Sequence, residues 1–93
     1  MATKFETTTR KYVFGSIQKI TVSGTSAAST AVGSSEVLLH ATTNCFINLS
    51  GAATSNHFPL NSGEKFHLQI SPGDTINVIQ ETTGGSLFVI PVY

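Results

Sequence analysis

The side chains of this chain that are best suited to chemistry are three histidines, one cysteine and five acidic residues. His40 and Cys45 flank a short polar segment, so a nucleophilic pair of cysteine and histidine is geometrically conceivable. The surrounding pattern argues against it. Cys45 alternates with Ile47 and belongs to an apolar strand face, where thiols are usually inert, and His40 falls on the opposite face from Leu39. We therefore predict that Cys45 is structural.

A second possibility is a hydrolase triad built from Asp74, a histidine and one of the many serines. Asp74 follows Pro72-Gly73, a sequence typical of a type II β-turn in which an aspartate caps local N–H groups, and no GxSxG elbow is present. His57 in a loop and His67 on a polar strand face are expected to be surface or interface residues. One histidine per subunit around a symmetry axis could still hold a metal.

Other reactive arrangements are missing from the sequence. Gly84-Gly85 is not followed by a helix that could bind phosphate, so we interpret it as a hairpin turn. No paired carboxylates suggest glycoside hydrolysis, and there is no tryptophan for stacking on sugars. We expect no enzyme activity, no catalytic residue, no bound metal and no cofactor.

The chain has 93 residues, which is the size of one small domain, so the elements that position these residues belong to a single domain. One cysteine permits no internal disulfide. Charged residues make up only 11% of the chain and the net charge is zero, which disfavours a nucleic-acid partner and suits a protein packed against others. No apolar run is long enough to span a membrane, and the first residues lack the apolar segment of a secretion signal, so we expect synthesis in the cytoplasm.

Apolar residues alternate with polar ones along most of the chain, which predicts strands. Residues 36–42 and 44–49 form two such runs, separated by what we interpret as a hairpin turn. Residues 65–70 form another, and residues 87–92 are almost wholly apolar, which predicts burial on both faces, by the core and by another subunit or the N-terminal arm. Residues 23–35 are small and polar and are expected to form a loop or a weak edge strand.

We therefore predict an all-β fold: a small antiparallel β-sandwich or jelly-roll-like barrel of six to eight strands, preceded by an extended N-terminal arm. Residues 1–14 would be the arm or a first strand, and residues 15–93 a single β-sandwich domain.

Several segments together resemble a known class of proteins. The Ser/Ala/Thr-rich loop, "NCFINLSG", "PLNSGEKFHLQISPGDTINVI" and the terminal "GGSLFVIPVY" resemble the small β-sandwich virion proteins of tailed bacteriophages, over about residues 17–93. The resemblance implies a structural role in the virion, such as capsid decoration (cement) or a tail-associated module, with assembly into a trimer or another symmetric homo-oligomer. It carries over no functional residue, because such proteins share a fold plan and no catalytic motif.

Our leading hypothesis is a non-enzymatic decoration protein, located in the virion, that binds the major capsid protein or another virion protein and contacts neither nucleic acid nor membrane. The alternative is a tail-associated or receptor- or carbohydrate-binding β-sandwich module, acting through residues 25–35 and 50–57. Aromatic and arginine side chains commonly anchor interfaces. The predicted interface residues are Phe5, Arg10, Tyr12, Phe14, Phe88, Ile90 and Tyr93. The first four could equally belong to a first strand and its core contacts.

Overall fold

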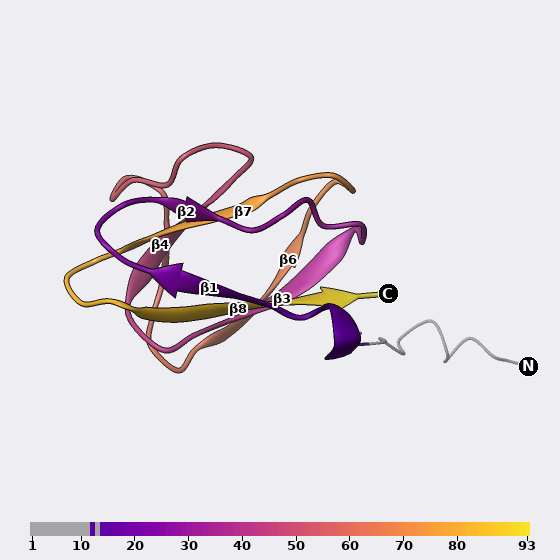
Figure 1. The fold of residues 1–93 in the computed structure, drawn as a ribbon, viewed down its shortest axis with the longest axis horizontal. Coiled ribbons are helices and arrows are strands. Elements are labelled where there is room, and N and C mark those ends of the chain that lie inside the picture. The colour runs from indigo at the N-terminus through magenta and orange to yellow at the C-terminus, as the bar shows by residue number, and fades with distance from the viewer. Residues whose placement is uncertain (1–11, 13) are drawn as a thin grey trace, which may run out of the picture.

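The protein is a sandwich of two four-stranded antiparallel sheets (Figure 1). The computed structural model describes Tyr12 and residues 14–93. The eight strands are β1 (Gln18–Val22), β2 (Ala27–Ala28), β3 (Glu36–Ala41), β4 (Cys45–Leu49), β5 (Phe58–Leu60), β6 (Lys65–Gln69), β7 (Ile76–Gln80) and β8 (Gly85–Val92). A single 3₁₀ turn, η2 (Phe14–Ser16), precedes them in the described part of the chain. The predicted all-β sandwich of six to eight strands is confirmed.

The order of the strands is that of a jelly roll. The first sheet, sheet A, has the order β1-β8-β3-β6, and the second, sheet B, has the order β2-β7-β4-β5. Among consecutive strands, β4 and β5 alone lie in the same sheet, and every other connection crosses from one sheet to the other. Such alternation between sheets is how an eight-stranded jelly roll is wound.

Two predictions of hairpin turns are therefore wrong, because both links join strands of different sheets. The link at residues 42–44 joins β3 in sheet A to β4 in sheet B, and the link at residues 81–84 joins β7 in sheet B to β8 in sheet A. These two corners bind each other: the Thr43 hydroxyl donates to the carbonyl of Thr83 over 2.7 Å, and the Glu81 N–H donates to the carbonyl of Asn44 over 3.0 Å. Long-range hydrogen bonds thus replace the local pairing that a hairpin would make.

The core lies between the sheets and follows the alternation in the sequence. On β3, Val37, Leu39 and Ala41 are fully buried, and on β4 the inward residues are Cys45 and Ile47. Strand β7 contributes Ile76 and Val78, and β8 contributes Leu87 and Val89, all fully buried. The predicted assignment of inward and outward faces on β3, β4 and β7 is confirmed, because the two-residue period of a strand allows only one apolar face to meet the core. Strand β8 was predicted to be buried on both faces, and within the described chain its outward Phe88 and Ile90 are partly buried.

Two turns have a glycine with positive φ at their third position. Gly73 has φ of 101° and Gly63 has φ of 80°, and each occupies the third position of a turn closed by a hydrogen bond between its first and fourth residues. Positive φ at the third position is the mark of a type II turn. The type II turn predicted at residues 71–74 is confirmed.

The first described residue, Tyr12, lies beside the end of β8. Tyr12 forms an isolated bridge with Val92, and η2 leads into β1. Within residues 23–35, Ala27–Ala28 forms the short edge strand β2 of sheet B, as expected for a weak edge strand. Residues 1–11, which hold most of the predicted arm, lie outside the described residues.

Candidate interaction surfaces

The cysteine and histidine that could have formed a nucleophilic pair lie in different sheets. Cys45 points into the core from β4 and is almost fully buried, and burial raises the pKa of its thiol to about 11. His40 lies on the outward side of β3 in sheet A, where its ring stacks on Phe88. A buried, protonated thiol with no imidazole beside it is a poor nucleophile.

The carboxylate of Asp74 belongs to a turn. One oxygen accepts a hydrogen bond from the Ser71 N–H and the other accepts one from the Ser50 hydroxyl, both over 2.9 Å. The first bond caps the turn and the second ties it to the end of β4. The predicted capping role is confirmed.

His57 is also held by its own loop. Its Nδ1 accepts a hydrogen bond from the Thr54 N–H over 2.8 Å, which places the ring proton on Nε2 when the imidazole is neutral. Within residues 12 and 14–93, no three histidine, cysteine or acidic side chains come together as a metal site, and no helix is long and apolar enough to cross a membrane.

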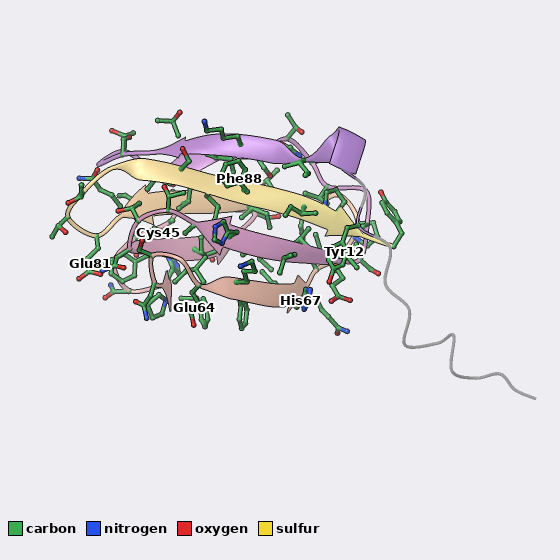
Figure 2. All side chains as sticks on the ribbon, turned by 90° about the horizontal axis from the view of Figure 1, so that it is seen from below. Tyr12, Cys45, Glu64, His67, Glu81 and Phe88 are labelled. Carbon is green, nitrogen blue, oxygen red and sulfur yellow. The ribbon has the colours of Figure 1, made fainter. Side chains whose placement is uncertain are left out.

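The outer face of sheet A carries a row of four residues that we call the cationic row. Lys19 on β1 pairs with Phe88 on β8, Phe88 pairs with His40 on β3, and His40 pairs with Lys65 on β6. Residues directly opposite one another across a sheet share a face. The ammonium of Lys19 lies 5.9 Å from the centre of the Phe88 ring, and the rings of Phe88 and His40 are 6.3 Å apart. Both lysines of the described part of the chain therefore lie in one row with Phe88, which is labelled in Figure 2.

Beside the cationic row this face is apolar. Ile90 pairs with Leu38, which in turn pairs with His67, and Leu38, Phe88 and Ile90 are all only partly buried. At the far end, the hydroxyl of Tyr12 lies 3.1 Å from Nε2 of His67, within hydrogen-bond distance (Figure 2). We call Leu38, Ile90 and the cationic row together the sheet A face. Outward positions of a solvated sheet are usually polar, so this apolar centre is typical of a contact surface.

A second apolar surface is the edge groove, at the side of the sandwich where β5 and β6 are the edge strands. Phe58 pairs with Ile47 and alternates with the buried Leu60, so it belongs to the core-facing side of β5, yet it is 46% exposed. Its ring meets that of Phe66 from the other sheet, with centroids 4.7 Å apart. The groove has a volume of about 340 Å³ and is lined by Leu39, Ile47, Asn48, Leu49, His57, Phe58, Phe66 and Leu68. The exposed Phe58 and the partly buried Phe66 and Leu68 thus border a recess above core residues that are themselves buried.

The opposite side of the sandwich, where β1 and β2 are the edge strands, has a recess of about 530 Å³ and polar contacts along it. The recess is lined by Ser16, Ile17, Gln18, Thr30, Ala31, Val32, Gly33, Pro91 and Tyr93. The side chain of Gln18 accepts a hydrogen bond from the Thr30 N–H over 2.9 Å and donates to the Thr30 carbonyl over 3.5 Å. Val32 belongs to the core and is 2% exposed. Both sides of the sandwich therefore carry a recess, and the edge groove differs in being lined mainly by apolar and aromatic side chains.

The residues predicted to form interfaces fall into three groups. Phe88 and Ile90 lie together on the sheet A face, with Tyr12 at its end. Tyr93 is 61% exposed and lies apart from them, beside Gly33. Phe5 and Arg10 lie outside the described residues, and of Phe14 the structure describes only the backbone.

Sequence reasoning missed the edge groove and the cationic row. The alternation of residues 65–70 assigned Phe66 correctly to the inward face, but nothing local showed that β5 would be too short to cover it. The row depends on the pairing of four strands from distant parts of the chain, so no local signal could have revealed it.

Comparison with known proteins gave no relative. No protein-family model matches the chain, and neither the curated proteins nor the solved structures contain a match to it.

Proposed function

We propose that this chain is a non-enzymatic structural protein of a tailed-bacteriophage virion, a decoration (cement) protein that binds the capsid surface and stabilises it through contacts between subunits. The observation that carries the proposal is the sheet A face, where Leu38, Phe88 and Ile90 form an outward apolar centre on a rigid sandwich. A protein whose purpose is adhesion requires such a surface, and the resemblance in sequence pattern supplies the virion context.

The charge of the chain supports the same function. Only 11% of its residues are charged, so few charges would lose their hydration when the protein is buried between neighbours. Its partners would be the major capsid protein or another virion protein and further copies of itself, with a trimer favoured. Residues 1–11 precede Tyr12, which lies at the end of the sheet A face, and in this proposal they reach across a subunit boundary.

The test is a truncation combined with capsid binding. Deleting residues 1–11 keeps Tyr12 with its neighbours Val92 and His67, so the sandwich is expected to keep its circular dichroism spectrum and melting temperature. Occupancy on capsids prepared without this protein should fall to background, measured by cosedimentation. Full occupancy by the truncated protein would show that the arm has no part in attachment, and no binding by the intact protein would reject the decoration role.

A second candidate is a receptor- or carbohydrate-binding module in the tail. The loops at residues 25–35 and 50–57 meet through a hydrogen bond of 2.9 Å from the Ala53 N–H to the Ser26 hydroxyl. The second loop is also ordered internally, since the Asn48 amide donates to the carbonyls of Gly51 and Ala52. An ordered pair of loops is the usual site of recognition on a β-sandwich. Loss of host-cell adsorption on substituting Ser55 and Asn56 in this loop, with capsid binding intact, would favour this candidate.

A further inference from the structure

The recess on the side of β1 and β2, which we call the polar recess, is larger than the edge groove. Its volume is about 530 Å³, compared with about 340 Å³ for the groove. Its lining comes from three segments: residues 16–18 of η2 and β1, residues 30–33, and the end of the chain after β8. Sites for small molecules usually have volumes of about 300–1,000 Å³, so the polar recess is large enough for such a ligand.

Hydrogen bonds hold the walls of the polar recess in place. The side chain of Gln18 joins two of the walls, because it bonds to both the N–H and the carbonyl of Thr30. The Ser29 hydroxyl donates to the same carbonyl over 2.8 Å, and the Val32 N–H donates to the carbonyl of Asp74 over 2.9 Å. Walls that are already ordered lose little conformational entropy when a ligand binds.

Several polar groups that line the polar recess are free to bind a ligand. The hydroxyls of Ser16, Thr30 and Tyr93 make no hydrogen bond to other residues in the described part of the chain. Gln18 uses one N–H and one lone pair on Thr30, so its amide keeps a second N–H and a second lone pair. A hydroxyl also donates and accepts. A ligand in the recess would therefore meet four groups that can each donate and accept.

The rest of the lining is apolar and uncharged. None of the described residues that line the polar recess has a charged side chain. Val32 and Pro91 are buried and form its floor, whereas Ile17 is 38% exposed and Tyr93 is 61% exposed. An ion would find no opposite charge here, and a wholly apolar molecule would leave the hydroxyls without partners. The lining fits an uncharged molecule that carries many hydroxyls and also has apolar C–H surfaces.

We propose that the polar recess binds a short neutral saccharide, whose hydroxyls bond to the free polar groups and whose C–H face packs on the ring of Tyr93. The site goes beyond the decoration role. None of its lining residues belongs to the sheet A face, so attachment through that face does not use it. It shares residues 30–33 with the loops of the second candidate function and does not involve residues 50–57.

The experiment is a titration of the isotope-labelled full chain with maltose, lactose and N,N′-diacetylchitobiose, followed by NMR of the backbone amides. Saturable shifts should appear at residues 16–18, 30–33 and 93. Thr30→Val replaces a hydroxyl by a methyl group of similar size and should raise the dissociation constant about two- to tenfold, and Tyr93→Leu should do the same through loss of the ring. Thr82→Val is the matched control at an exposed position outside the recess and should leave the constant unchanged.

Three results would overturn the site: no saturable shift with any of the saccharides, shifts centred on residues 50–57, or a dissociation constant that neither Thr30→Val nor Tyr93→Leu changes. A response to an acetylated and amidated Ser-Gly-Ser peptide, with none to the saccharides, would also overturn it and assign the recess to a peptide. If Tyr93→Leu loses the amide spectrum of a folded protein, Ser16→Ala takes its place, with the same two- to tenfold effect expected from about one lost hydrogen bond. Cosedimentation separates the two proposals: a chain that binds saccharide but not capsids rejects the decoration role alone, and the reverse result rejects the saccharide site alone.

Discussion

Replacing Gly85 by alanine tests whether the two corners of the jelly roll are packed as tightly as the structure shows. A Cβ atom at Gly85 would lie 2.8 Å from Oγ1 of Thr42 and 2.9 Å from both Cβ and Cγ2 of Thr43. These neighbours are held in place, because the Thr42 hydroxyl accepts a hydrogen bond from the Ser86 N–H and the Thr43 hydroxyl donates to the Thr83 carbonyl. The new methyl group therefore has to displace a hydrogen-bonded corner.

The expected loss of stability follows from two costs. Inserting a methyl group into a close-packed site costs about 1–3 kcal/mol, and breaking the bond of the buried Thr43 hydroxyl costs about 1–3 kcal/mol. The lower chain entropy of alanine in the unfolded state offsets about 0.4–1 kcal/mol. We expect a net decrease of about 2–4 kcal/mol in the free energy of unfolding, which for a domain of this size lowers Tm by about 10–25 °C.

Thermal melting and urea denaturation measure this loss. Gly15→Ala is the matched control, since a Cβ there meets nothing within 4 Å and only the entropic gain remains, so its free energy of unfolding should rise by about 0.4–1 kcal/mol. Thr43→Ser removes Cγ2 and keeps the hydroxyl, so Gly85→Ala should cost less in that background. A Gly85→Ala protein that melts within a few degrees of the wild type would refute the packing of this corner.

Two further perturbations address the residues first considered for chemistry. Because burial raises the pKa of the Cys45 thiol from 9.0 to about 11, the folded state holds this proton more tightly than the unfolded state. The resulting stabilisation is complete below pH 9 and is lost as the pH rises toward 11, so urea titrations should show a steeper loss for the wild type than for Cys45→Ala. Equal slopes would contradict the burial. Asp74→Ala removes the acceptor of the Ser71 N–H and the Ser50 hydroxyl and should cost about 1–2 kcal/mol in urea denaturation, with Asp74→Asn between the two. No loss would mean that the carboxylate does not hold the turn.

Strand faces were predictable because the signal for them is local. In residues 36–41 and 45–49 apolar side chains recur at every second position, and the core accepts only one side of a strand. The turn at residues 71–74 was predictable for a similar reason, since proline fixes φ at its second position and glycine permits positive φ at its third.

Strand partners were not predictable, and this is where the hairpin interpretations failed. A short link such as residues 42–44 fits both a hairpin and a corner between sheets, and local sequence does not distinguish them. The choice depends on which distant strands pair: β8, from the end of the chain, inserts between β1 and β3. Gly85 is required for the same long-range reason, because Thr42 and Thr43 pack against it.

The sequence by itself determined an all-β chain, the inward and outward side of its strands and the inert surroundings of Cys45, since each depends on side-chain period and turn chemistry. Tertiary structure alone decided that Lys19, Phe88, His40 and Lys65 form one row, because four strands from different parts of the chain have to pair in register. It also decided that Phe58, on the core-facing side of its strand, stays exposed, because β5 is a short edge strand with no further strand beyond it. The surfaces that could bind a partner are therefore products of the fold.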